Sequence, residues 1–274
     1  MISLCLRDKE SAPFILVMVP KLLQEYRDAG DNGQYAVNTP GRQVPATLHG
    51  AAKSGRIATM MSNPELHSKG RLLAVGDIHG CLRQLTELLA QVAPTDLDQV
   101  VFLGDYVDRG PDSAGVIDYL INFAGSFPAT VFLRGNHEQM FADYLAGRDP
   151  SAFLINGGLK TLASYHKLGQ WPVPATHRAF LDALRNSYET PDFIFVHAGM
   201  RPGIPLAEQD DLDLAWIRRE FISSDYDWGK PVVYGHTPVE EPVLSDKRLG
   251  LDTGCVYGRR LTCCEVRTRR IWQA

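Results

Sequence analysis

The sequence predicts an α/β fold, and three observations support this prediction. Short apolar runs of strand length alternate with longer segments in which apolar residues recur with the period of a helix. The runs are almost wholly apolar, as in strands that are buried on both faces of a parallel sheet. Each of the first three runs also leads into a glycine followed by a polar residue, at Gly76, Gly104 and Gly135. This order of elements is typical of βαβ units whose helices cover the sheet.

The first part of the predicted fold contains three strand–helix pairs. Five apolar residues share one face of the first helix, as expected for a helix that packs against a sheet: Leu82, Leu85, Leu88, Leu89 and Val92. The predicted pairs are, in order, residues 72–75 with 81–93, 100–103 with 113–123, and 130–133 with a helix that begins at His137.

The second part is predicted to hold a long helical stretch, residues 151–187, followed by several short strands. These strands are expected at residues 193–196, 232–234 and 249–251, and near Leu261 and Ile271. Because turn sequences at 252–254 and 256–258 separate short apolar runs, we expect a second, more antiparallel sheet.

The chain divides near Lys69 into an N-terminal extension, residues 1–69, and a folded domain, residues 70–274. Residues 29–70 are rich in Gly, Pro, Asn, Ser and Thr and sustain no apolar period of 2 or 3.6. We therefore expect the extension to be mostly unstructured. An alternative is that translation starts at Met60 or Met61 and that the extension is a mis-assigned upstream start.

Composition and charge exclude several classes of function. The net charge of -4 gives no general attraction to nucleic acid or to an acidic membrane surface. No run approaches the ~18 apolar residues that a membrane span needs. The five cysteines show no C-x-x-C spacing and are interpreted as reduced thiols. We therefore expect a cytoplasmic protein without a nucleic-acid or membrane partner, and its oligomeric state stays open.

Side chains that can bind metal ions follow five of the predicted strands. Because ligand sites of open α/β sheets lie beyond the carboxyl ends of their strands, we expect these side chains to converge. The set comprises Asp77, His79, Asp105, Asp108, Asn136, His137, His197 and His236. Taken alone, an Asp or Asn at such a turn is often only a helix cap, and a single His is often only packed in a core. Capping does not call for histidine and arginine as well, so the whole set favours a metal centre.

The ligand types predict two divalent metal ions. Oxygen and nitrogen ligands without a thiolate suit Mn, Fe or Zn, and a single ion could not use so many groups. Two ions about 3.5–4 Å apart could clamp the attacking and leaving oxygens of a displacement at phosphorus. Arg109 is expected beside them, where a guanidinium binds phosphate oxygens. These residues predict hydrolysis of a phosphate ester, with Mn²⁺ favoured and Fe or Zn as alternatives.

Five motifs in order, GDIHG, GDYVDRG, GNHE, HAG and GHT, resemble the phosphoprotein phosphatase family of binuclear metallophosphoesterases. The resemblance covers the chain from about Leu72 to its end. It implies a calcineurin-like catalytic domain, residues 70–274, built as a β-sandwich of mixed sheets flanked by helices. The metal site would lie at the C-terminal ends of the strands.

Carried over by position, the resemblance implies a role for each motif residue. Asp77 and His79 would hold the first ion, Asp105 would bridge both, and Asn136, His197 and His236 would hold the second. Arg109 would bind the phosphoryl oxygens, and His137, oriented by Asp108, would protonate the leaving oxygen. Arg218 follows Trp216 as in the bacterial and phage members, and is assigned as the second phosphate-binding arginine. The competing interpretation is an amphipathic helix over residues 216–221 with Arg218 in solvent.

The expected substrate is a phosphorylated protein or peptide. The chain lacks the S-A-P-N-Y-C stretch of the eukaryotic protein phosphatases and thus resembles the bacterial and phage serine/threonine branch. Glu138 and Asp108 favour a phosphomonoesterase, because the symmetric dinucleoside tetraphosphate hydrolases usually have GNHD and lack that aspartate. We expect attack by a metal-bridging hydroxide on phosphoserine or phosphothreonine, with phosphotyrosine left open. The alternatives are a diadenosine tetraphosphate hydrolase on the same scaffold and a binding module that has lost catalysis.

Overall fold

Two five-stranded mixed sheets form the centre of the fold in a computed structural model that describes residues 70–274. The predictions for residues 1–69 lie outside the described residues. In each sheet two of the pairings between neighbouring strands are parallel and two are antiparallel. The α/β class and the mixed sheets of the prediction are therefore confirmed.

The first sheet has the strand order β10-β9-β1-β2-β3. Its parallel strands are β1 (Leu72–Val75), β2 (Gln99–Phe102) and β3 (Val131–Phe132). β9 (Thr262–Glu265) pairs antiparallel with β1, and β10 (Arg270–Gln273) pairs antiparallel with β9. The two C-terminal strands were expected with the later strands, but they extend the first sheet, because an apolar run does not specify its partner strand.

The second sheet has the order β4-β5-β6-β8-β7. Its three central strands run parallel, so the expectation of a more antiparallel sheet is correct only at the edges. The strands are β4 (Ser187–Glu189), β5 (Ile194–Val196), β6 (Val232–Tyr234), β7 (Val243–Leu244) and β8 (Arg248–Gly250).

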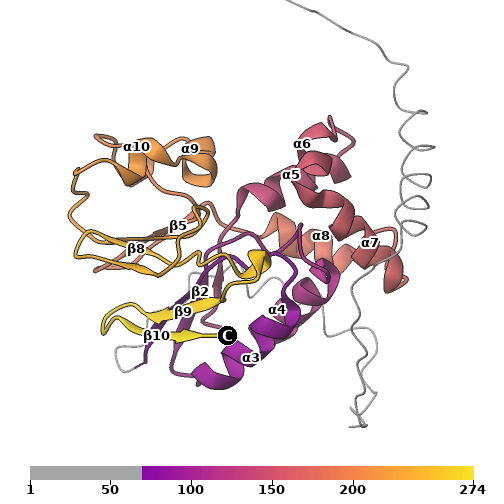
Figure 1. Ribbon diagram of the computed structural model, residues 1–274, viewed down its shortest axis with the longest axis horizontal. Helices are drawn as coiled ribbons and strands as arrows, with labels where there is room; N and C mark the ends of the chain where they lie inside the picture. The colour runs from indigo at the N-terminus through magenta and orange to yellow at the C-terminus, as the bar shows by residue number, and fades with distance from the viewer. Residues whose placement is uncertain (1–69) are drawn as a thin grey trace, which may run out of the picture. The chain divides into compact units, whose positions relative to one another are not determined.

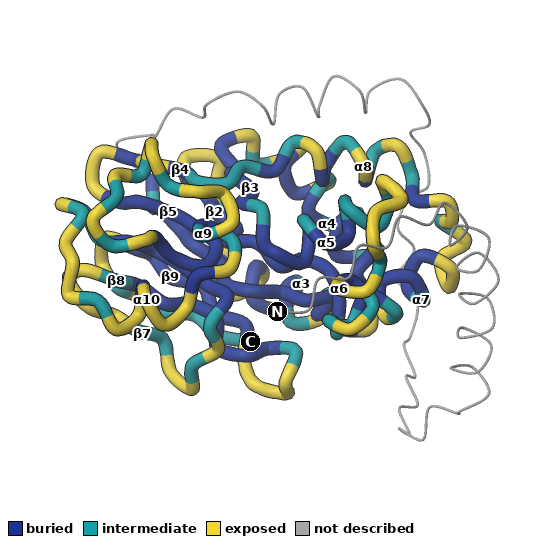
Figure 2. Tube along the Cα trace, turned by 90° about the horizontal axis from the view of Figure 1, so that it is seen from above, coloured by how far each residue is buried: buried dark blue, intermediate teal, exposed yellow. Residues whose placement is uncertain are grey.

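The main core lies between the two sheets. Alternate residues of β1, such as Leu72 and Ala74, pack with Phe195 and Val233 from the second sheet. A second core cluster joins the outer face of β5 and β6 to the helical segment around Ile217. The central strands of the two sheets, such as β2 and β5, are accordingly buried in Figure 2. Residues 72–75 are apolar throughout because one face of β1 meets the other sheet while the opposite face meets helices.

Helices cover both outer faces (Figure 1). The helices after the first two strands are α3 (Leu82–Val92) and α4 (Ser113–Ser126), and α9 (Asp211–Trp216) and α10 (Arg219–Ile222) lie over the second sheet. The remaining helical segments are α5 (Asn136–Leu145), α6 (Ser151–Phe153), the π-helical turn η1 (Leu154–Gly158), α7 (Leu159–Lys167), α8 (Ala175–Asp182), η2 (Leu206–Glu208) and η3 (Cys255–Tyr257). The single stretch predicted over 151–187 is thus several short helices. Within residues 70–274 no helix has the length and apolar character needed to cross a membrane.

Candidate metal centre

The predicted site residues come together where strands of both sheets end. The loops after β1, β2 and β3 carry residues from the first sheet, and the loops after β5 and β6 bring His197 and His236 from the second. The residues of the predicted metal set and its acid–base pair are all buried. Because the two sheets pack face to face, their strand ends form one shared edge of the sandwich.

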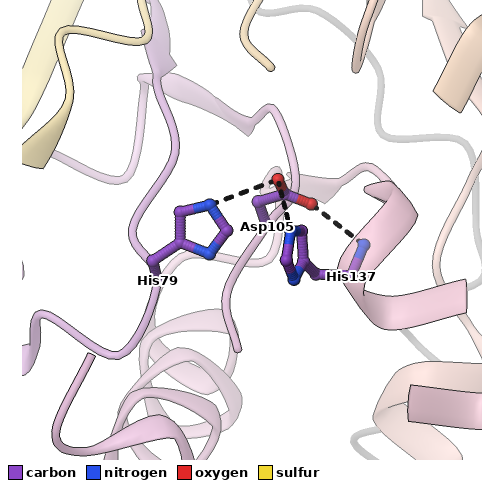
Figure 3. Close-up of side chains that lie close together, drawn as sticks. All are labelled: His79, Asp105 and His137. Carbon is purple, nitrogen blue, oxygen red and sulfur yellow. Dashed lines mark hydrogen bonds and ion pairs between the residues drawn. The ribbon is translucent and has the colours of Figure 1, made fainter. Parts of the chain in front are cut away.

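Asp105 is the centre of two groups of potential ligands. One group is His79, Asp105 and His137, and the other is Asp105, His197 and His236; within each, one ligand atom per residue lies within 4.8 Å of the others. Oδ2 of Asp105 is 3.4 Å from Nε2 of His79, and Oδ1 is 3.3 Å from Nε2 of His197. Figure 3 shows the first group converging on this carboxylate. With one oxygen toward each group, Asp105 is placed as a bridging ligand would be.

Asn136 and Asp77 lie at the margins of these groups. Oδ1 of Asn136 is 3.1 Å from Nε2 of His197, which places the amide with the second group. Oδ2 of Asp77 accepts a hydrogen bond from the backbone N–H of His236 at 2.9 Å. Its other oxygen, Oδ1, is buried without a hydrogen-bond partner, and Asp77 belongs to neither 4.8 Å group. The structure therefore brings Asp77 to the centre, with one oxygen still available.

The imidazoles are held with Nε2 toward the centre. Nδ1 of His79 lies 2.8 Å from the carbonyl oxygen of Val107, and Nδ1 of His197 lies 2.8 Å from that of Leu103. A carbonyl can only accept, so Nδ1 carries the proton in both rings and Nε2 keeps its lone pair when the ring is neutral. Backbone carbonyls fix metal-binding histidines in this way.

Burial sets the charge state of two of these rings. It lowers the pKa of His79 to about 3 and that of His236 to about 2. Both rings are therefore neutral near pH 7, as metal ligation requires. Burial alone would raise the pKa of Asp105, but the neighbouring His197 and His137 hold it well below the ordinary value.

A cluster of buried carboxylates adds negative charge at the same place. Burial raises the pKa of Asp77 well above its usual range, and repulsion from Asp252 and Asp105 adds to this effect. Buried carboxylates are normally paired with cations or hydrogen-bond donors, and Oδ1 of Asp77 has neither among the described residues. The donor set, the free oxygen and the excess of negative charge all fit divalent cations. Asp252 was read only as a turn residue, although it follows the buried strand β8 as the other acids follow theirs.

Several residues of the site have strained backbone conformations, which direct their side chains toward the centre. His79, Asp105, Asp108, Arg109 and His236 all have positive φ angles, between 46° and 71°. Such conformations are uncommon for residues other than glycine and persist where the surroundings enforce them, often at functional sites. Close approach is the second constraint: a Cβ at position 135 would lie 2.1 Å from Oδ1 of Asp105, so only glycine fits there.

Glu138 holds the loop that carries Asp105. Its Oε2 accepts hydrogen bonds from the backbone N–H groups of Asp105 and Gly135, and its Oε1 accepts from those of Tyr106 and Val107. This carboxylate thus ties the loop after β2 to the start of α5. The sequence analysis used Glu138 only to distinguish families and missed this role. Its position as the third residue of a helix, where Glu commonly reaches back to the helix start, was the available signal.

His137 and Asp108 form the expected pair. Nδ1 of His137 lies 2.7 Å from Oδ2 of Asp108, while Nε2 of His137 is buried without a hydrogen-bond partner, 4.0 Å from Oδ2 of Asp105. Thr161 donates to Oδ1 of Asp108 at 2.7 Å and was missed by the sequence analysis. It lies on α7, 53 residues further along, and no local pattern marks such a contact.

Two arginines lie at the centre. Nη1 of the half-buried Arg109 is 2.7 Å from Nε2 of His79. Arg218 is exposed, and its positive charge contributes to the lowered pKa of both His137 and His236. It is not part of an amphipathic helix over 216–221, because α9 ends at Trp216 and α10 begins at Arg219.

Comparison with known proteins shows which phosphate-ester hydrolases this chain is similar to. The chain is 29% identical over 218 residues to the asymmetrical bis(5'-nucleosyl)-tetraphosphatase PrpE of Oceanobacillus iheyensis, covering 69% of this chain and 85% of that protein. It is 29% identical over 229 residues to the protein of the same name from Bacillus subtilis, covering 69% and 87%. Among solved structures, a putative diadenosine tetraphosphatase matches with a TM-score of 0.60 and 26% identity, over 77% of this chain and 95% of that one.

A protein serine/threonine phosphatase from Saccharomyces cerevisiae also matches, with a TM-score of 0.52 over 72% of this chain and 74% of that one. Its sequence identity is only 16%, so this likeness concerns the fold alone.

These relatives overturn the expectation of a phosphoprotein phosphatase. Their names specify tetraphosphates that join two nucleosides, which was the stated alternative. The expectation relied on Asp108 and Glu138. In the structure Glu138 braces a loop and Asp108 contacts His137, and neither contact depends on what the phosphate is attached to. The two residues therefore cannot distinguish these substrates, and the serine/threonine branch is not confirmed.

The family itself is clear. The model of the calcineurin-like phosphoesterases matches residues 70–264, which include both sheets up to β9 and every residue of the centre. Enzymes of this family are hydrolases that use divalent metal ions, and the donor set around Asp105 fits such ions. On the extent of this match, the chain belongs to the calcineurin-like phosphoesterase family.

Proposed function

We propose that this chain hydrolyses dinucleoside polyphosphates and cuts the phosphate bridge off-centre. The observation that carries the proposal is its likeness to asymmetrical bis(5'-nucleosyl)-tetraphosphatases over 69% of its length. A bridge of four phosphates that is cut off-centre gives a nucleoside monophosphate and a nucleoside triphosphate. Water supplies the oxygen that joins phosphorus, and the bond between that phosphorus and a bridging oxygen breaks.

The residues that would hold two divalent ions are those carried over from the resemblance: Asp77, His79, Asp105, Asn136, His197 and His236. We assign Mn²⁺ as the favoured ion, because a mixed set of carboxylate, amide and imidazole ligands without thiolate suits it. When bound, such ions neutralise phosphate oxygens and make water a better nucleophile at neutral pH.

The chain's own cations would bind the polyphosphate. Arg109 lies against His79, and the positive charge of Arg218 contributes to the lowered pKa of His137 and His236. Each guanidinium can donate two parallel hydrogen bonds to phosphate oxygens. Both arginines would therefore bind oxygens of a polyphosphate at the centre.

His137 would donate a proton at Nε2 to the bridging oxygen as it leaves. The hydrogen bond between Nδ1 and Asp108 orients the ring, and Thr161 holds Asp108 in turn. The leaving group here is a nucleoside mono- or triphosphate, and either is a much weaker base than the alkoxide released from a phosphoserine. Proton donation by His137 should therefore matter less for a dinucleotide than for an alkyl phosphate.

Product analysis tests the proposal. The purified full-length chain is stripped of metal, reloaded with Mn²⁺ and incubated with diadenosine tetraphosphate, and the nucleotides are separated by chromatography. We expect AMP and ATP in equal amounts and no ADP. Two molecules of ADP would contradict off-centre cleavage, and phosphate release from phosphopeptides with an intact dinucleotide would contradict the substrate. The Asp105→Asn variant, purified in the same way, controls for contaminating hydrolases.

A further inference from the structure

Two exposed aromatic side chains stand at the metal centre, and the proposed chemistry so far gives them no role. Tyr257 is 58% exposed and Trp216 is 37% exposed. Apolar side chains of this size that remain in solvent beside a binding site commonly contact a ligand. Because a dinucleoside polyphosphate carries a flat base at each end, the positions of these two rings are informative.

Tyr257 lies beside Arg109. The Cζ atom of Arg109 is 5.9 Å from the centre of the Tyr257 ring, and the same guanidinium contacts His79. Tyr257 ends the short turn η3, which sits between two glycines with positive φ, Gly254 and Gly258. Oδ1 of the buried Asp252 accepts the backbone N–H of Gly254 at 2.9 Å, so the turn is anchored to the centre.

Trp216 lies at the other group of ligands. Its ring meets that of His236 nearly at a right angle, with the centroids 6.2 Å apart. Ile217 has an extended backbone and is buried against the second sheet, so its neighbours Trp216 and Arg218 both lie outside that core. The tryptophan ring is therefore presented to solvent at the His236 side of the centre.

The centre thus has an exposed aromatic ring at each of its two ligand groups. Tyr257 lies with Arg109 at the group that contains His79, and Trp216 lies at the group that contains His236. A nucleotide needs aromatic contacts as well as cations, because its phosphates bind guanidinium groups and its base stacks on aromatic rings. Two such rings across one centre match a ligand with a nucleoside at each end of a phosphate chain.

We propose that Trp216 and Tyr257 each stack one base of the dinucleoside polyphosphate and so select it over phosphate compounds without bases. This inference rests on the proposed function and extends it to substrate selection. Stacking is tolerant of base identity, because every base offers a flat face. The enzyme should accordingly tolerate exchange of adenine for guanine better than removal of the base.

The test compares a ligand with two bases and a ligand with none. For each variant, the KM of diadenosine tetraphosphate is divided by the inhibition constant of inorganic tripolyphosphate in the same assay, so that any general damage to the centre cancels. Stacking of one base on an aromatic side chain changes affinity by a factor of about 5 to 150, so Trp216→Ala and Tyr257→Ala should each raise this ratio at least about fivefold. Trp216→Phe and Tyr257→Phe keep a ring and should change the ratio by less than about threefold.

Trp171 provides the matched control. It is 39% exposed and its ring stacks on His166. Among the described residues its ring contacts none of the metal ligands. Trp171→Ala should leave the ratio unchanged. If both alanine variants at the site also leave it unchanged while the wild type cleaves the dinucleotide, the stacking inference is wrong and the proposed function stands. If the wild type does not cleave the dinucleotide at all, both are wrong.

Discussion

A buried aspartate lies at each end of strands β1 and β2, and the two aspartates differ in whether their oxygens have hydrogen-bond partners. At their amino ends, Asp98 accepts hydrogen bonds from the backbone and side chain of Arg71 and from Thr95. At their carboxyl ends, Asp77 keeps one oxygen without any partner. At the amino end the aspartate has all its hydrogen-bond partners within the protein and stabilises the fold. At the carboxyl end the ligands lack a partner that a cation would supply, and we call this end of the sheet the open end.

The pKa values of these acids express the same contrast. Burial would raise the pKa of Asp98, but the hydrogen bonds from Arg71 and Thr95 outweigh it and lower the pKa to about 2. For Asp77, burial raises the pKa, and the nearby Asp252 and Asp105 raise it further. A pKa that falls on folding reports stabilisation, whereas one that rises reports a cost of folding. Side chains that cost stability are retained where they bind or react.

Asp105→Asn should have the largest effect at the open end. Loss of the shared carboxylate should lower kcat on diadenosine tetraphosphate by at least about 10³-fold and remove most of the bound Mn²⁺. In EDTA the variant should also be less stable than the wild type, because His197 and His137 lower the pKa of Asp105 on folding and the amide loses this stabilisation. Metal content, kcat and thermal melting with and without EDTA are measured together. A variant that retains both ions and turnover would refute the central place of this carboxylate.

His137→Asn should have the next largest effect, and it should depend on the leaving group. Turnover of an alkyl phosphate should fall about 10²-fold or more, and that of the dinucleotide by less. His137 also lies within the first ligand group, so metal content distinguishes its two roles. Retained metal supports proton donation, whereas loss of one ion would identify His137 as a ligand. Asp108→Asn, which keeps the His137 ring, should also lower turnover of the alkyl phosphate more than turnover of the dinucleotide.

The ligand positions were readable from the sequence because each follows a buried strand directly. A glycine and a polar residue after an apolar run predict a side chain at a sheet edge, which is how Asp105 and His197 were found. Thr161 was missed because its contact with Asp108 depends on how segments distant in the sequence fold together. The partner of strand β9 was missed for the same reason, since pairing is not encoded in the strand alone.

The substrate was the least readable part. The residues that bind metal and phosphate are required for any phosphate ester, so they do not reveal the group that the phosphate carries. That group would contact side chains such as Tyr257, which stands in a short turn and alone has no distinguishing pattern. The motifs therefore predict the reaction centre more securely than they predict the substrate.

Asp98→Asn should have a smaller effect, on stability and not on turnover. A pKa that drops to about 2 corresponds to about 2 kcal/mol of stabilisation at neutral pH, which the amide should lose. Because the folded pKa is the lower one, this stabilisation is complete above about pH 5 and disappears as the pH falls toward 2. Urea unfolding of both proteins in EDTA at pH 7 and at pH 3 measures the difference. A difference that grew on acidification would contradict the assignment.

Glu87→Gln should have the smallest effect and shows what makes Asp98 different. Glu87 also pairs with an arginine, Arg83, at 3.0 Å, but on the exposed face of α3. The pair is exposed to solvent. The arginine precedes the glutamate along the helix, which is the less favourable order for such a pair. Loss of the pair should therefore lower the free energy of unfolding by less than about 0.5 kcal/mol. Urea midpoints at low and high salt measure this cost. If Glu87→Gln lost as much stability as Asp98→Asn, any ion pair would stabilise the fold equally well. A small loss indicates that the stabilisation by Asp98 arises from its burial together with a full set of hydrogen bonds. The carboxylates of the metal centre are buried without such a full set.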